Sequence, residues 1–230
     1  MYYITGDTHR DFKNIIFYTY IKNTTKDDVF IILGDAGINY FLDDRDYELK
    51  KQLSKLPVTL FCIKGNHEKY PETIGSYKIK EWNGAKVFYE EEFPNLLFAK
   101  DGEIYNIENK KVLTIGGAYS VDKFYRIVKN IGWFEDEQPS EEVKRYTEEN
   151  LEKNNWKVDI VLSHTCPEKT MPTHLFMQGL DQSKVDHSTE KWLDEISDKL
   201  EFERWYFGHF HGVWENGKFE LMFNNMKNFP

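Results

Sequence analysis

Apolar runs recur along the chain, and each one ends in a short polar stretch. The runs cover residues 2–5, 29–33, 58–63, 158–162 and 205–207. A run without polar alternation is typical of a strand that is covered on both faces of its sheet. We therefore predict five buried strands, each followed by a turn that carries polar side chains.

The segments between these runs predict helices. Apolar residues recur at helical spacing over 12–20, and the charged segment 43–55 has the pattern of an amphipathic helix. Further helices are predicted over 140–154, with Ser140 as the N-cap, and near 190–200. In the first third of the chain the strand-to-strand step is roughly thirty residues, the length of one β-α-β unit. The pattern therefore predicts an α/β fold.

The middle of the chain follows a different pattern. A loop rich in aromatic and basic residues is expected over 116–133, and a hairpin is expected around 216–217. Short strand candidates joined by turn signals predict an antiparallel meander, and they lie at 86–89, 96–99, 103–107 and 112–115. We find no internal repeat or linker, so we expect a single domain over residues 1–230.

Composition and charge narrow the class of protein. With 40% apolar and 16% aromatic residues, the chain can bury a full core. The 39 acidic and 30 basic residues give a net charge of −9, which argues against a duplex nucleic acid or an anionic membrane as partner. We also expect no membrane span and no signal peptide. Cys62 and Cys166 do not form a disulfide framework, so we expect a cytoplasmic protein.

Eight polar residues follow the five buried runs, and five of the seven histidines are among them. The eight are Asp7, His9, Asp35, Asn66, His67, His164, His209 and His211. Each one alone is typical of a hydrogen-bonded turn residue, but the repetition after five strands favours a shared site. Because His209 and His211 are two residues apart, extended backbone would project both rings to the same side.

The types of these residues indicate a metal site. Imidazole, carboxylate and one amide oxygen suit a pair of borderline divalent ions better than calcium. Cysteine thiolates are absent from the set, which argues against a closed structural zinc site.

The order of these blocks carries a resemblance to a known family. Asp7-x-His9, Gly34-Asp35, Gly65-Asn66-His67-Glu68, His164 and Gly208-His209-x-His211 resemble the motifs of the calcineurin-like metallophosphoesterase superfamily. The segment 116–126 and the stretch 133–142 further resemble a group of bacterial and phage-borne members. The resemblance covers nearly the whole chain, and it implies a four-layer α/β/β/α sandwich of two mixed sheets.

The resemblance also implies roles for the eight residues. One metal ion would be held by Asp7, His9 and His211, and the other by Asn66, His164 and His209. Asp35 would bridge the two ions, so it counts as a catalytic residue together with His67. The ions would be manganese, with iron, zinc or nickel as alternatives, and they would supply a hydroxide that attacks phosphorus. His67 would stabilise or protonate the leaving oxygen.

Several activities occur within such a superfamily. Phosphoprotein phosphatases normally carry Gly where Arg10 stands, and the Asp-Arg that usually follows their second block is missing beside Asp35. A nuclease should add a basic track, and a non-catalytic binding scaffold should have lost ligands. We therefore predict a phosphoesterase that acts on a small nucleotide-like phosphodiester or phosphomonoester, with the protein phosphatase, nuclease and scaffold as alternatives.

Four further residues are candidates for substrate contact. Arg10 could grip a phosphate beside the metals, or it could be a solvated cation at the start of a helix. Lys123 and Arg126 follow the glycine turn at 116–117 and could contact substrate or be surface charges. Tyr119 could stack on a base or serve ordinary packing. We assign no role to His174, His187 or Cys166.

Overall fold

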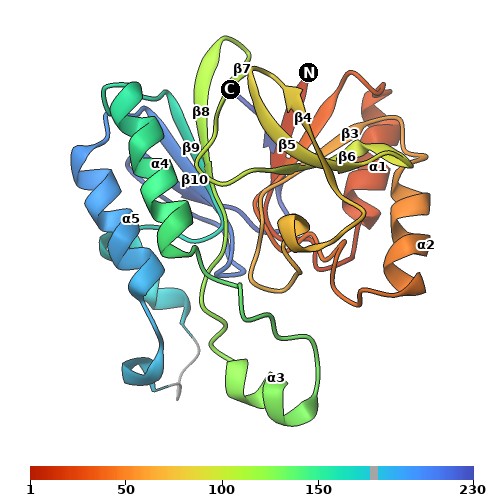
Figure 1. Cartoon of the computed structure of the whole chain (residues 1–230). Coiled ribbons are helices and arrows are strands. Elements are labelled where there is room, and N and C mark those ends of the chain that lie inside the picture. Colours follow the sequence, from red (N-terminus) through yellow and green to blue (C-terminus); the bar gives the residue numbers. More distant parts are fainter. Residues whose placement is uncertain (177–180) are drawn as a thin grey trace.

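Two β-sheets lie face to face, and helices cover the outer side of each sheet (Figure 1). The computed structural model describes residues 1–176 and 181–230. Helices α1 (Lys13–Lys22) and α2 (Asp44–Leu53) lie outside the first sheet, and α4 (Glu141–Lys153) and α5 (Ser188–Lys199) lie outside the second. The predicted α/β/β/α sandwich is confirmed.

The first sheet has the strand order β13-β1-β2-β3-β6-β5-β4. Its central strands β1, β2, β3 and β6 are parallel, and antiparallel strands flank them. The bounds are β1 (Tyr2–Thr5), β2 (Val29–Ile32), β3 (Thr59–Cys62), β4 (Lys78–Trp82), β5 (Ala85–Glu90), β6 (Phe93–Ala99) and β13 (Met226–Asn228).

The second sheet has the order β11-β12-β10-β9-β8-β7. Strands β8, β9, β10 and β12 are parallel, while β7 and β11 close the two edges in antiparallel pairing. The bounds are β7 (Ile104–Ile107), β8 (Lys110–Ile115), β9 (Ile160–Ser163), β10 (Arg204–Phe207), β11 (Trp214–Asn216) and β12 (Phe219–Leu221).

Three layers of core explain why the central strands are apolar on both faces. Ile31 of β2 packs between the sheets, in the same cluster as Leu162 of β9. Its neighbours Phe30 and Ile32 point to the other face and pack with Ile15 of α1. A third cluster lies between the second sheet and α4 and α5. Because side chains alternate along a strand, a strand covered on both faces must be apolar at successive positions.

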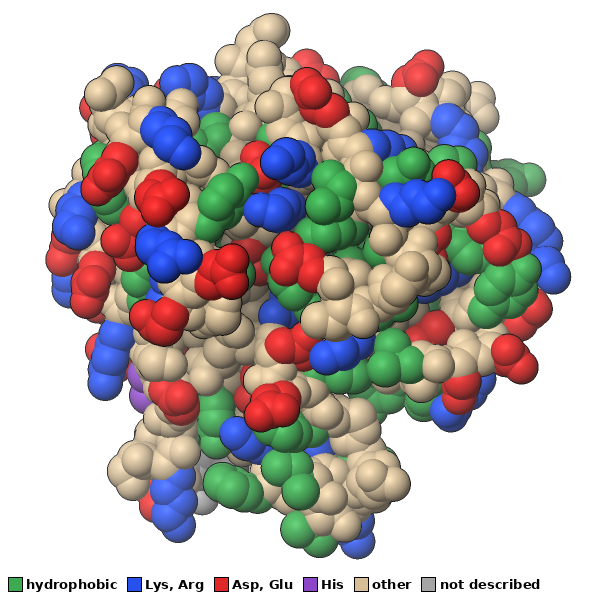
Figure 2. Space-filling model, in the orientation of Figure 1, with side chains coloured by type: hydrophobic (Ala, Val, Ile, Leu, Met, Phe, Trp, Pro, Cys, Tyr) green, Lys and Arg blue, Asp and Glu red, His purple; other side chains and the backbone are tan. Residues whose placement is uncertain are grey.

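Local sequence signals fix some boundaries and miss others. The Ser140 hydroxyl accepts from the Val143 N–H at 3.3 Å, as expected of the N-cap of α4. The predicted loop 116–133 instead contains the short helix α3 (Lys123–Lys129), none of whose residues is buried. It projects from the sandwich in Figure 1, and hydrophobic side chains gather over that projection in Figure 2. Phe124 and Val128 are among its exposed apolar residues.

The four predicted strands are confirmed as β5, β6, β7 and β8, but their arrangement as one antiparallel meander is wrong. Strands β5 and β6 pair in the first sheet and β7 and β8 pair in the second, so the chain changes sheet between β6 and β7. The pattern also missed β4 and β13. The hairpin around 216–217 is confirmed as β11 and β12.

The remaining described segments add short turns and no membrane element. Between β9 and α5, residues 177–180 lie outside the described part of the chain. Within the described residues, no helix combines the length and apolarity that a membrane span requires. Short 3₁₀ helices occur at Pro71–Thr73, Glu168–Thr170, Thr173–Leu175 and Gln182–Lys184.

Candidate metal centre

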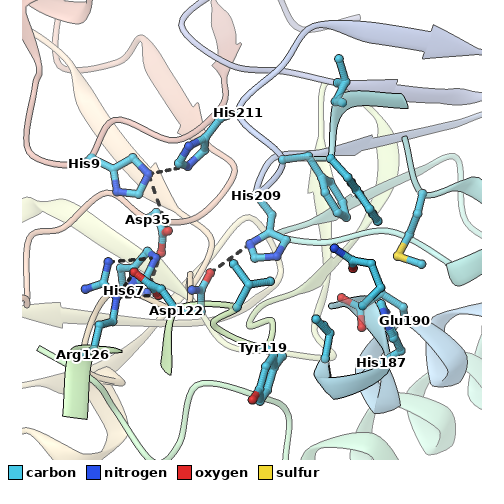
Figure 3. A pocket seen from close by; sticks show the side chains of 18 residues that line it. His9, Asp35, His67, Tyr119, Asp122, Arg126, His187, Glu190, His209 and His211 are labelled. Carbon is cyan, nitrogen blue, oxygen red and sulfur yellow. Dashed lines mark hydrogen bonds and ion pairs between the residues drawn. The ribbon is translucent and has the colours of Figure 1, made fainter. Parts of the chain in front are cut away.

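The carboxyl ends of β1, β2, β3, β9 and β10 bring the eight predicted polar residues together. They lie at one end of the sandwich, where both sheets contribute, and most of them line a single pocket of about 600 Å³. Figure 3 shows that His9, His211 and Asp35 lie close together, with His209 beside them. Ligands collect at the carboxyl ends of parallel strands because the loops there are free to carry function.

The first group of donors comes from the two ends of the chain. His9 Nε2 lies 2.8 Å from His211 Nε2. The Asp7 Oδ2 atom is 3.7 Å from His9 Nε2 and 3.4 Å from His211 Nε2. Three donor atoms within this range of one another can share one cation.

The second group is centred on the Asn66 amide. Asn66 Oδ1 lies 2.8 Å from His164 Nε2 and 3.1 Å from His209 Nδ1. The Asn66 amide nitrogen donates to the Ser120 hydroxyl at 2.8 Å, which turns the amide oxygen toward the two imidazoles. Ser120 therefore orients a donor that it does not itself supply.

Asp35 lies between the two groups. Its Oδ2 atom is 3.8 Å from His9 Nε2 and 3.7 Å from His164 Nε2. Its Oδ1 atom accepts from the His67 backbone N–H at 2.8 Å, which fixes the carboxylate. One carboxylate is thus in reach of both groups, as a bridging ligand has to be.

The hydrogen bonds of His164 indicate that a cation belongs in the second group. His164 Nδ1 lies 2.8 Å from the Leu33 carbonyl, which can only accept, so Nδ1 carries the proton. When the ring is neutral, its lone pair sits at Nε2 and faces the lone pairs of Asn66 Oδ1. Two facing acceptors repel unless a proton or a metal ion lies between them. His9 and His211 also bring two Nε2 atoms face to face, so the donor set fits divalent cations.

Backbone conformation differs from the prediction at the histidine pair. His209 and His211 have φ angles of 69° and 48°, so the expected extended backbone is wrong. His9 and Asp35 are left-handed as well, with φ angles of 44° and 48°. Non-glycine residues rarely adopt this conformation, and such strain is typical of functional sites.

Two motif glycines allow the chain to approach the carboxylates closely. A Cβ atom at Gly65 would lie 1.9 Å from Asp35 Oδ1, and one at Gly208 would lie 2.2 Å from Asp7 Oδ1. Asp7 uses that closeness to accept from the His209 backbone N–H at 3.0 Å. Any larger residue at either glycine would displace a carboxylate.

The electrostatics favour metal-binding protonation states at Asp35 and His209 and oppose them at His211. Burial opposes ionisation of Asp35, but the nearby imidazoles, His164 foremost, outweigh it and hold the pKa of Asp35 below its usual range. Burial, with His164 next, lowers the pKa of His209 well below its usual value. A hydrogen bond to Asp7 raises the pKa of His211. Asp35 is thus a carboxylate and His209 a neutral imidazole at neutral pH, as metal ligands must be.

His67 stands beside these groups, on the pocket wall. Its Nε2 atom is 3.4 Å from Arg126 Nη2, and its buried Nδ1 atom has no hydrogen-bond partner among residues 1–176 and 181–230. The Arg126 Nε atom pairs with both carboxylate oxygens of Asp122 at 2.8 Å. Figure 3 shows these three side chains together. Burial lowers the pKa of His67, and the Arg126 charge contributes.

The four predicted substrate contacts lie in different places. Arg126 and Tyr119 line the pocket. The Arg10 guanidinium instead turns toward α2, where it donates to Asp46 at 2.5 Å. The Lys123 ammonium lies 4.5 Å from the centre of the Trp133 ring. The structure therefore brings two of the four to the pocket.

Sequence reasoning missed other residues around the centre. Ser120 and Asp122 lie in the aromatic and basic loop, and a hydroxyl or carboxylate that acts on another side chain leaves no pattern of its own. His187 and Glu190 line the pocket although neither was assigned a role. A polar residue at the start of a helix is usually solvated, so nothing in the sequence distinguished them.

Comparison with protein families identifies the family of this chain. The family model described as calcineurin-like phosphoesterase matches residues 2–213. The chain belongs to the calcineurin-like phosphoesterase family. Membership of this phosphoesterase family makes the protein a metal-dependent hydrolase of phosphoester bonds, and the donor groups above are where its divalent ions would bind. No curated protein sequence matches the chain significantly.

Solved structures of the same fold are distant in sequence. TT1561 of Thermus thermophilus is 12% identical with a TM-score of 0.52, and the match covers 96% of this chain and 87% of that one. A second structure is 13% identical with a TM-score of 0.51, covering 96% and 88%. At such identities the phosphoesterase shares the fold alone with them. AQ665 from Aquifex aeolicus, a protein of unknown function, is 17% identical over 72% and 80%, with a TM-score of 0.28 that supports no inference.

Proposed function

We propose that this phosphoesterase hydrolyses a small phosphodiester or nucleotide-like phosphoester, with two divalent ions, manganese by preference. One observation carries the proposal: two groups of donor atoms share the Asp35 carboxylate in a pocket of about 600 Å³. That volume suits a small organic substrate.

The donor geometry suggests which residues would hold the ions. Asp7, His9 and His211 would hold one ion, and Asn66, His164 and His209 would hold the other, with Asp35 between them. When bound, two such ions polarise a phosphoryl oxygen and lower the pKa of a shared water molecule. The protein's contribution is to fix the donors, through Ser120 on Asn66 and the Leu33 carbonyl on His164.

Two side chains on the pocket wall would act on the substrate directly. His67 lies beside Asp35, to which its backbone N–H donates, and it lines the pocket, where its ring would deliver a proton to the leaving oxygen. Arg126 is oriented by Asp122, and its Nη2 atom faces His67. We propose that this guanidinium contacts the phosphate whose leaving oxygen His67 protonates.

The other activities of such a fold have less support. Arg10 pairs with Asp46 of α2, so it supplies no phosphate contact. On the face drawn in Figure 2, acidic and basic side chains are interspersed, whereas a nuclease would need a basic track. A non-catalytic scaffold has no need of a full donor set with oriented partners. A cytoplasmic location stays a prediction.

The test is hydrolysis of bis-p-nitrophenyl phosphate and p-nitrophenyl phosphate, side by side, with added Mn²⁺. We expect the wild type to prefer the diester and Asp35→Asn to lose both activity and bound metal. Preference for the monoester would redirect the proposal to a phosphatase. If metal-loaded protein hydrolysed neither ester, the result would contradict the proposed function and favour the non-catalytic scaffold.

A further inference from the structure

The pocket has a second end that the metal centre does not use. Away from His9 and Asp35, its lining is largely apolar, and Figure 3 shows Glu190 and His187 on that side. Phe176 and Phe210 stack there with ring centres 5.8 Å apart and planes at 14°. The other apolar lining residues are Val121, Met171, Leu175 and Val185.

Glu190 is the buried polar group at this end. It is 4% exposed, although it lines the pocket. Its Oε1 atom accepts from the Thr165 hydroxyl at 2.8 Å, which holds the carboxyl group in place. Its Oε2 atom finds no hydrogen-bond partner within the described ranges 1–176 and 181–230. Burial raises the pKa of Glu190, and the hydrogen bond from Thr165 opposes that rise.

An acceptor left without a donor in a buried site needs an explanation, because it costs free energy that a partner would recover. A ligand that donates an N–H to Oε2 would recover it. A second phosphate would not, since it offers only acceptors and like charge. The apolar and aromatic walls favour a flat ring that carries the N–H group over a strongly hydrated ammonium.

We propose that Glu190 is a specificity residue that accepts hydrogen bonds from a nucleobase of the substrate, guanine above the others. Guanine offers two neighbouring N–H donors on its Watson–Crick edge, a pairing that suits a carboxylate. The phosphoester of such a nucleotide would lie at the metal centre while its base reaches Glu190. This assignment rests on the proposed hydrolysis of a nucleotide-like phosphoester and names its substrate class.

The test compares p-nitrophenyl 5′-phosphate esters of guanosine, inosine and uridine, with bis-p-nitrophenyl phosphate as the base-free reference. Inosine lacks only the exocyclic amino group of guanosine. We expect the Mn²⁺-loaded wild type to favour the guanosine ester over the inosine ester by roughly 10-fold or more in kcat/KM. An aminoethyl p-nitrophenyl phosphate tests the ammonium alternative, and its preference over every nucleoside ester would overturn the assignment of a base.

Glu190→Gln is the informative variant. Thr165 would keep the amide oxygen at the Oε1 position, which places an NH₂ donor where Oε2 accepts now. We expect the ratio of guanosine to inosine ester rates to fall to about 1, since the amide repels the N–H groups. Glu195→Gln, an exposed carboxylate on the same helix, should keep the wild-type ratio. Because the readout is a ratio within one protein, a general loss of activity does not mimic it.

The outcomes distinguish the assignment of Glu190 from the proposed hydrolysis of a small phosphoester. Hydrolysis of the base-free diester with equal rates for all three nucleoside esters would overturn the role of Glu190 alone. A guanosine preference that persists in Glu190→Gln would do the same. If the wild type hydrolyses neither the base-free diester nor any nucleoside ester, the proposed function fails and this assignment falls with it.

Discussion

The Nε2 atoms of His9 and His211 lie 2.8 Å apart although 202 residues separate them in the chain. Neither nitrogen can satisfy the other unless a proton or a cation lies between them. Asp7, which is fully buried and accepts from the His209 backbone, completes the group. Either a shared proton or a bound cation therefore satisfies the pair.

Removing one member of this pair should cost one metal ion. We expect His211→Ala to lower bound Mn²⁺ from about two ions per chain to about one, since a site left with Asp7, His9 and the shared Asp35 binds more weakly. Elemental analysis after dialysis measures this. His174→Ala, which removes an exposed histidine, is the matched control. Two ions retained by His211→Ala would remove it from the ligand set.

The proposed proton donor should matter most when the leaving group is poor. We expect His67→Ala to keep its metals and to slow hydrolysis of a phenyl ester by about 10²- to 10⁴-fold. A p-nitrophenyl ester should suffer less, because p-nitrophenolate leaves without a proton. Steady-state rates on the two esters give the comparison. Equal losses on both would mean that His67 acts in some other way.

Ser120 should affect metal affinity without touching a metal. Its hydroxyl accepts from the Asn66 amide, so Ser120→Ala frees the amide to rotate. We expect about a 10-fold weaker Mn²⁺ affinity, in the range found for partners of metal ligands. Titration of metal-free protein followed by calorimetry measures the change. Ser54→Ala, at the C-cap of α2, should leave the affinity as it is.

Metal removal should lower thermal stability. A ligand that binds one site of the folded state at 100 times its Kd stabilises by about 2.7 kcal/mol. For a chain of this size that corresponds to roughly 5 to 10 °C in Tm. Scanning calorimetry with Mn²⁺ and with chelator should reveal the difference, and Asp35→Asn should abolish it. A chelator effect of the same size in Asp35→Asn would point to a different binding site.

The buried carboxyl of Glu190 should make stability depend on pH. Its pKa is raised in the folded protein and returns to its ordinary value near 4.5 on unfolding. Below that value the group is neutral in both states, and as pH rises through the raised pKa the folded protein must lose a proton that it holds tightly. Wild type should therefore lose stability relative to Glu190→Gln as pH rises.

Chemical denaturation of metal-free protein at pH 4.5 and pH 8 measures this trend. His187 and Asp186 also act on the Glu190 pKa, the first lowering it and the second raising it, and both remain in the variant. Glu195→Gln should show no such trend. A gap between wild type and Glu190→Gln that is the same at both pH values would contradict the raised pKa.

The sequence predicted the polar residues that follow the five apolar runs. Strands buried on both faces must be apolar throughout, and the polar residues that end them stand out by contrast. That contrast singled out Asp7, Asp35 and His164, which the structure brings together. The position of Asn66 between two imidazoles depends on strand order, which the linear pattern does not contain.

Features set by tertiary contacts were not predictable in this way. Helix α3 is 7 residues long and buries none of them, so the helical spacing of Phe124, Ile127 and Val128 marks no face that packs on the core. The change of sheet between β6 and β7 depends on which strands they meet, since β6 joins β3 and β8 joins β9. The hydrogen bond from Thr165 to Glu190 joins residues 25 positions apart, and neither has a distinctive pattern.

Strand β13 has a consequence for the handling of this protein. It pairs antiparallel with β1, placing Asn228 opposite Tyr3, while Phe229 is buried behind it. Without β13, β1 would present a row of unpaired N–H and C=O groups, which is a template for pairing with another chain. Proteolytic loss of residues 225–230 would thus leave β1 as an unpaired edge strand. Aggregation would be the first sign that a preparation had lost these residues.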